Sequence, residues 1–70
     1  MKQVAANMAG TVINVLVQAG DEVTEGQDVV VLESMKMEVP IQAEVAGKVT
    51  EVKVNIGDFV NEGDVLITLE

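Results

Sequence analysis

Short runs of β-branched residues, separated by turn signals that contain glycine, follow one another along the whole chain. Such runs are typical of strands, and no segment shows the sustained periodicity of an amphipathic helix. We therefore expect an all-β protein with five main strands and three shorter extended pieces. The main strands are Thr11–Val17, Asp28–Glu33, Met37–Gln42, Lys48–Val54 and Val65–Leu69, and the shorter pieces are Gln3–Ala6, Glu22–Val23 and Phe59–Val60.

Strict alternation of apolar and polar residues is broken at matching places in two of these strands. Val15 and Val17 share one face of their strand, whereas Val12 has the opposite parity, and the same slip separates Val49 from Val52. A β-bulge would reconcile the parity, because one extra residue moves the following side chains to the other face. Residues 29–32 form a continuous apolar run and predict a central strand that is covered on both faces.

The pattern of strands and turns occurs twice in the sequence. Residues 1–33 align without a gap with residues 38–70 at a constant offset of 37, and thirteen aligned pairs are identical. Two like halves predict a single domain over residues 1–70, a flattened β-barrel or sandwich of two four-stranded antiparallel sheets related by a pseudo-two-fold axis. The insert Ser34–Met37 has no counterpart in the repeat. We expect it to form a hairpin turn at one end of the domain, with the chain termini at the other end.

Composition narrows the function classes. The chain of 70 residues has one aromatic residue, no cysteine and no histidine, so we expect neither a metal site nor catalytic residues of its own. The formal net charge of −8 argues against nucleic acid and anionic membranes, and it favours partners with basic surfaces. Since no apolar run is long enough for a membrane span or a signal peptide, we expect a cytoplasmic protein, and we expect it to be monomeric.

The insert is an unusual sequence for a turn. If Met35 and Lys36 form a two-residue loop, both need a positive φ, which Asn-Gly or Asp-Gly would adopt more readily. The outer residues of Ser34–Met37 would then pair with each other, and Glu33 would lie opposite Glu38. That register places two carboxylates behind the lysine ammonium, although like charges in direct opposition are mildly unfavourable. A poor turn sequence indicates that something other than turn stability selected these residues.

A lysine at a hairpin tip is commonly a solubilising residue, but its neighbours here are not polar. Met35 and Met37 add apolar surface on both sides of Lys36, whereas a lysine that serves only solubility would not be flanked by apolar residues. Methionine surfaces adapt readily to a partner. We therefore take Lys36 as the candidate functional group, with Met35, Met37, Glu33 and Glu38 as candidate recognition residues.

At these residues the sequence resembles a known family. The segment Glu33–Glu38 resembles the attachment motif of biotinyl domains, Met-Lys-Met with the central lysine biotinylated. Gly20–Gly26 and Gly57–Gly63 are similar to the turns of the biotinyl/lipoyl carrier fold, so the resemblance covers essentially the whole chain. Only Gln18–Glu22 separates the second strand from the third. This leaves no room for the protruding thumb of acetyl-CoA carboxylase carriers, and the chain is most similar to thumbless biotin carboxyl carrier domains.

The resemblance implies a carrier rather than an enzyme. Lys36 would hold covalent biotin, attached by a biotin protein ligase. The domain would then shuttle a carboxyl group between a biotin carboxylase and a carboxyltransferase, as a subunit or partner of a biotin-dependent carboxylase. Met35 and Met37 would be recognised by the ligase or by the carboxylase sites.

Two alternatives stay open. Lipoyl domains share the fold and usually have Asp-Lys-Ala at the turn, so Lys36 would carry lipoate in place of biotin, or either acid in a dual carrier. The same fold also serves as an interaction module without a cofactor, in which case Lys36 would remain unmodified.

Overall fold

The protein is described by a computed structural model that covers residues 2–70 and contains eight strands in that range. All the predicted strands are present, and no boundary differs from its prediction by more than two residues. The strands are β1 (Lys2–Ala5), β2 (Gly10–Val15), β3 (Glu22–Val23), β4 (Asp28–Ser34), β5 (Met37–Gln42), β6 (Gly47–Val52), β7 (Phe59–Val60) and β8 (Val65–Leu69). The all-β prediction is confirmed.

The strands form two four-stranded antiparallel sheets, with the orders β1-β8-β6-β3 and β5-β4-β2-β7. The sheets face each other across one core and form a flattened barrel about 32 Å long and 19 × 18 Å across. One order becomes the other when each strand is exchanged for the strand 37 residues along the chain, β1 for β5 and β2 for β6. The predicted architecture of two like sheets is therefore confirmed.

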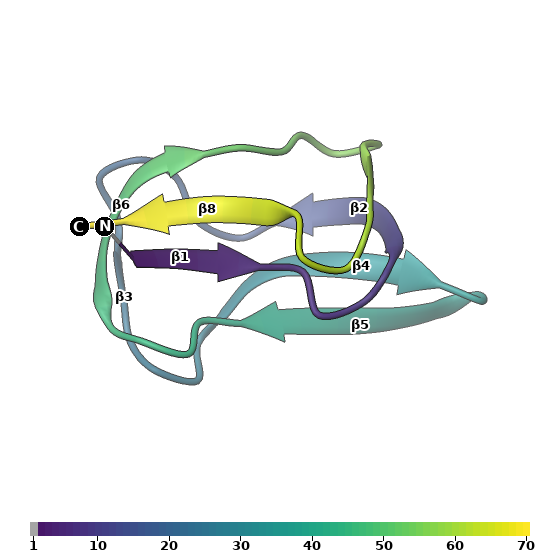
Figure 1. Ribbon diagram of the computed structural model, residues 1–70, viewed down its shortest axis with the longest axis horizontal. Helices are drawn as coiled ribbons and strands as arrows, with labels where there is room; N and C mark the ends of the chain where they lie inside the picture. The colour runs from purple at the N-terminus through teal and green to yellow at the C-terminus, as the bar shows by residue number, and fades with distance from the viewer. Residues whose placement is uncertain (1) are drawn as a thin grey trace.

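The β4–β5 hairpin extends beyond the rest of the barrel at one end (Figure 1). At the other end β1 begins and β8 finishes, with Lys2 paired to Leu69. The insert thus lies at the opposite pole from Lys2 and Leu69, as the repeat predicts, while the predicted place of Met1 lies outside the described residues. Within residues 2–70, no helix is long and apolar enough to cross a membrane.

Strands β2 and β6 each end two residues before their predicted ends, and hydrogen bonds explain why. The Leu16 N–H still donates to the carbonyl of Val29 at 2.9 Å, next to the end of β2. The chain then leaves this sheet for the other one, where the Gly20 N–H donates to the carbonyl of Val49 at 2.8 Å. Val17 and Val54, two residues after the ends of β2 and β6, remain in the core although they no longer belong to a ladder. Propensity alone cannot locate such a change of sheet.

The predicted bulges are confirmed. The register between β2 and β4 shifts between Val12 and Asn14, and the register between β6 and β8 shifts between Val49 and Glu51. Each shift puts the first valine of its strand, Val12 or Val49, into the core. The later valine, Val15 or Val52, still packs against the core. The break in alternation seen in the sequence therefore corresponds to one extra, bulged residue in each strand.

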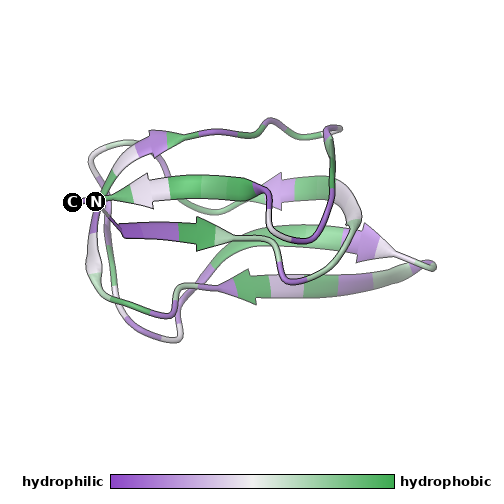
Figure 2. Cartoon of the chain, viewed as in Figure 1, coloured by the Kyte–Doolittle hydropathy of each residue, from purple (hydrophilic) through white to green (hydrophobic). Residues whose placement is uncertain are grey.

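The core lies between the two sheets, and its packing corrects one prediction. Strand β4 is central in its sheet, but Val31 is half-buried on the outer face, so only the inner face is covered. Val29 and Val30 are both buried because the register with β5 shifts between Asp28 and Val30. Figure 2 shows hydrophobic colouring along most of β8 and alternation along β5. The largest fully buried side chains are Leu32, Leu66, Ile67, Leu69, Val12, Val29, Val30 and Val49.

Tight turns connect the sheets, and carboxylates stabilise them. In the turn Gln18–Asp21, Gly20 has a φ of 98°, as the third residue of a type II turn requires. The Asp21 carboxylate accepts a hydrogen bond from the Gln18 N–H at 2.9 Å, and the Asp21 N–H donates to the Gln18 carbonyl at 3.0 Å. The counterpart turn, Asn55–Asp58, has the same arrangement, with a carboxylate bond of 2.8 Å. Both aspartates thus cap their turns.

Candidate functional site

The insert forms the two-residue turn that the sequence predicts. Ser34 pairs with Met37, and Glu33 lies opposite Glu38 at the end of the β4–β5 ladder. Met35 has a φ of 52° and Lys36 a φ of 65°, and they are the only non-glycine residues in the described chain with a positive φ. Two successive left-handed residues are the signature of a type I′ turn, whose twist matches that of the flanking strands. The geometry of the hairpin thus overrides the preferences of its residues.

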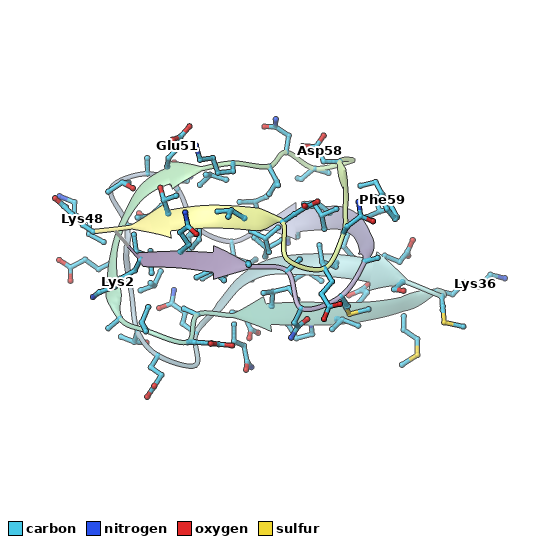
Figure 3. All side chains as sticks on the ribbon, in the orientation of Figure 1. Lys2, Lys36, Lys48, Glu51, Asp58 and Phe59 are labelled. Carbon is cyan, nitrogen blue, oxygen red and sulfur yellow. The ribbon has the colours of Figure 1, made fainter. Side chains whose placement is uncertain are left out.

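Lys36 differs from the other lysines in its position at the tip of a hairpin. Among residues 2–70 its ammonium makes neither a hydrogen bond nor an ion pair. The Lys2 ammonium donates to a backbone carbonyl at 2.7 Å, and the Lys53 ammonium lies 3.0 Å from the carboxylate of Glu51. Lys48 is also exposed, but it lies on β6 at the opposite pole. Figure 3 shows the Lys36 side chain pointing away from the body at the tip of the hairpin.

The two methionines of the turn are strongly exposed. Met35 is 91% exposed and Met37 is 66% exposed. Neither side chain belongs to the core, so their apolar surface contributes nothing to the stability of the isolated domain. Apolar surface that flanks a free amine is available to a protein that binds the tip.

Glu33 and Glu38 lie one residue pair behind the turn, on the outer face of their sheet. Both side chains are exposed, and the two residues are direct cross-strand partners. In antiparallel sheets the Cβ atoms of such partners are roughly 5 Å apart, so the two negative charges repel each other mildly. The pair gives the base of the hairpin an acidic character, which suits a partner with basic side chains.

The structure adds a residue that the sequence did not single out for this site. Gly10 is buried inside β2, and its φ is not positive, so it does not serve as a turn glycine. A Cβ atom built on Gly10 would lie 2.9 Å from the carbonyl oxygen of Glu33 and 3.3 Å from the Cβ of Leu32. Gly10 therefore lets β2 approach the base of the hairpin closely. A Cβ atom built on the counterpart residue, Gly47, would lie equally close to the carbonyl oxygen of Glu70. The identical glycines in the two repeats were therefore a sequence signal for this close packing.

Two hollows in the described residues lie away from this site. A cavity of about 400 Å³ is lined by Val15 and Val17 together with their counterparts Val52 and Val54. A second one, of about 270 Å³, lies along the seam between β1 and β5. Neither is lined by a residue of the hairpin tip. Among residues 2–70 there is also no group of three or more acidic, histidine or cysteine side chains placed to hold a metal ion.

The arrangement fits a covalent attachment point rather than an enclosed binding site. A primary amine at an exposed turn is open to acylation from a wide range of directions. Rigid pairing below the turn fixes its position, because Glu33 and Ser34 are held in the ladder by their β5 partners. The Lys36 amine can thus hold an acyl group away from the body of the domain.

Known proteins match this chain along most of its length. The family described as Biotin-requiring enzyme matches residues 2–69. The biotin/lipoyl attachment protein of Bacillus subtilis (strain 168) is 58% identical over 41 residues, which are 59% of this chain and 56% of that protein. Pyruvate carboxylase of the same organism is 50% identical over 40 residues, 57% of this chain and 4% of that protein. The chain thus matches a little over half of one curated relative and a small part of the other.

A solved structure has the same fold. The structure of a single-chain, multi-domain long-chain acyl-CoA carboxylase superposes with a TM-score of 0.85 at 36% identity, over 94% of this chain and 7% of that one. The two-sheet barrel and the projecting hairpin are thus similar to a module within a much larger enzyme. Because the family match extends over nearly every residue, this chain belongs to the biotin/lipoyl attachment family.

Proposed function

We propose that the domain is a biotin carboxyl carrier and that Lys36 is the residue to which biotin is attached. The observation that carries the proposal is the free Lys36 ammonium at the tip of a strained turn, at the position of the family's Met-Lys-Met motif. The similarity to parts of pyruvate carboxylase and of an acyl-CoA carboxylase supports a role with a biotin carboxylase and a carboxyltransferase. The domain is then a substrate and a carrier, and its partners perform the catalysis.

Attachment would form one amide bond. The neutral Lys36 amine attacks the carboxyl carbon of biotin that a biotin protein ligase has activated as an adenylate. AMP leaves, and a base of the ligase accepts the proton that the amine loses. Among residues 2–70, no side chain makes a hydrogen bond or an ion pair with the Lys36 ammonium, so the described chain holds no base in contact with the amine. The ligase must therefore supply it.

The carrier's own residues supply position and approach. When bound, biotin provides the ureido group that accepts and releases the carboxyl group. The paired strands hold the attachment point at one pole of a rigid barrel, so each partner meets the arm in a reproducible orientation. The net charge of −8 favours fast encounters with basic surfaces, and exposed contacts at the tip favour rapid release.

The direct test is modification of the intact chain in cells supplied with both biotin and lipoate. We expect an intact mass that is larger by one biotinyl group and a positive avidin blot, and we expect Lys36→Arg to abolish both. Lys48→Arg is the matched control, because Lys48 is also exposed but lies at the other pole. Labelling of Lys36→Arg at the level of the unsubstituted protein would place the site elsewhere, and an unmodified protein would favour the interaction module.

Lipoate remains a second candidate, since one relative is named a biotin/lipoyl attachment protein. A mass increase that matches lipoate alone would refute the biotin assignment, whereas a mixture of both products would define a dual carrier.

We further propose that the domain acts as a cytoplasmic monomer. Its charge of −8 opposes self-association, and two of its four edge strands contain only two residues and offer little for pairing. Analytical ultracentrifugation and cell fractionation test these two points.

A further inference from the structure

The only aromatic residue of the chain lies on its surface. Phe59 is 65% exposed on β7, whereas its neighbour Val60 is 3% exposed and belongs to the core. A single exposed apolar residue is normal in a soluble protein and by itself indicates nothing. What matters is where the fold places this one.

The strand register brings Phe59 into line with the base of the hairpin. On the outer face of one sheet, Phe59 pairs with Thr11, Thr11 with Glu33, and Glu33 with Glu38. These four residues form a row across the sheet, which we call the Phe59 row. Strands are about 4.8 Å apart, so Phe59 lies roughly 10 Å from Glu33 along this row. Figure 3 shows Phe59 in the half of the molecule that carries Lys36.

The repeat supplies an internal control for this placement. The counterparts of Phe59, Thr11 and Glu33 at the other pole are Glu22, Lys48 and Glu70, and Glu22 pairs with Lys48 as Phe59 pairs with Thr11. The scaffold therefore accepts a glutamate at this position of a two-residue edge strand. An aromatic side chain occurs only at the pole that holds the candidate lysine.

The same pole carries half of the large hydrophobic residues that are exposed in the described chain. Three of the six, Met35, Met37 and Phe59, lie on the hairpin or in the row behind it. The row also carries the two carboxylates Glu33 and Glu38. An aromatic anchor next to paired charges resembles the energetic centre and polar rim of a protein interface.

We propose that the Phe59 row is the docking surface for the ligase that acylates Lys36. Phe59 fills an apolar pocket of that enzyme, and Glu33 and Glu38 meet basic side chains at the rim of the pocket. The inference rests on the proposed function of Lys36. The ligase is the occupant because it must bring its active site to the ε-amine itself and so must cover the protein surface beside the turn. Later partners meet the far end of the acylated arm.

The test measures steady-state biotin incorporation into the intact chain by purified ligase with ATP and biotin. We expect Phe59→Thr, which keeps a β-forming residue on the strand, to lower kcat/KM about 30-fold through KM, with kcat unchanged. Glu22→Phe is the matched control, because it creates an exposed phenylalanine at the counterpart position. We expect Glu22→Phe to leave kcat/KM within about twofold of the unsubstituted value, since a contact at the far pole is absent from the complex.

Several outcomes overturn the proposal. A value of kcat/KM within twofold of the unsubstituted protein for Phe59→Thr would do so, as would an equal loss in Glu22→Phe. Normal biotin incorporation combined with slower carboxyl transfer would assign the row to the carboxylase instead. Thermal unfolding verifies that each variant is folded. If Phe59→Thr is not, Phe59→Glu decides, because the scaffold holds a glutamate at the counterpart position. Absence of acylation in the unsubstituted chain would refute the proposed function itself, which separates the two failures.

Discussion

The turn that carries Lys36 and the turns of the scaffold all require positive φ values, but they use different residues to adopt them. At Gln18–Asp21 and Asn55–Asp58, glycine takes the positive φ and an aspartate carboxylate caps a backbone N–H. At the hairpin tip, Met35 and Lys36 adopt positive φ values with no such help in the described chain. The sequence is therefore optimal for folding where the chain is repeated, and it departs from that optimum where it is not.

The departure has a measurable size. A left-handed conformation costs a residue other than glycine about 1–2 kcal/mol. A domain of this length has a free energy of unfolding of roughly 4–10 kcal/mol in total. Two strained residues thus forgo a substantial part of the stability that the chain could have. Under the proposed function, this stability is forgone for residues that a partner binds. Exchanging properties between the two kinds of turn tests that explanation.

The largest effect should come from moving the amine while the composition of the turn stays the same. In the double variant Met35→Lys/Lys36→Met, the lysine shifts by one residue along the hairpin. We expect kcat/KM for biotin incorporation to fall by about 100-fold or more, because small displacements of a reacting group carry penalties of that order. The free energy of unfolding should change by less than about 0.5 kcal/mol, since both side chains remain exposed.

Initial rates with purified ligase and urea unfolding measure the two quantities. Lys36→Arg gives the background rate for these assays. A double variant that is acylated within tenfold of the unsubstituted rate would show that the ligase does not read the position of the lysine on the turn.

We expect an intermediate effect from substituting the two equivalent glycines, one in each half of the repeat, that pack closely against a backbone carbonyl. Gly10→Ala and Gly47→Ala each place a Cβ atom 2.9 Å from a backbone carbonyl oxygen, that of Glu33 or that of Glu70. Backbone cannot yield as a flexible side chain can, so each variant should lose about 2 kcal/mol of unfolding free energy. Only Gly10→Ala disturbs the base of the hairpin, and only this variant should also lower kcat/KM for biotin incorporation.

Urea titration and ligase kinetics, both under conditions where each variant is folded, separate the two expectations. Equal losses of kcat/KM in the two glycine variants would contradict a local role for Gly10 beneath the hairpin. Unequal losses of stability would contradict the equivalence of the two poles.

Much of this fold follows from the sequence because the determining signals are local. The β-branched runs and the glycine-aspartate turns identify every strand, and the parity slip between Val12 and Val15 identifies a bulge. The hairpin register follows from the insert, because a two-residue loop leaves only one pairing for Ser34–Met37. What the local pattern misses depends on contacts between distant segments. The tight packing of Gly10 is one example, since it requires knowledge of which strand lies beside β2.

The position of Phe59 is another such case. Its strand has only two residues, and nothing in its own sequence shows that it pairs with β2 rather than with another edge. The alignment of the two halves nevertheless held a signal, because it sets the single aromatic residue against Glu22. In a duplicated chain, a mismatch at an exposed strand position is worth examining as a functional residue, since the scaffold is satisfied by either side chain.

The smallest effect is expected for Met35→Asn, and it is the most informative one, because stability should rise while the acylation rate falls. Met35→Asn gives the turn a residue that tolerates positive φ, and we expect it to gain about 1 kcal/mol and about 4–8 °C in Tm. Acylation should become slower, since the exposed methionine is lost. Met37→Asn makes the same chemical change on β5, where φ is not positive, so its Tm should be unchanged or lower. Calorimetry and ligase kinetics measure both properties. A similar rise in Tm for both variants would mean that exposed methionine, rather than backbone strain, limits the stability of the hairpin.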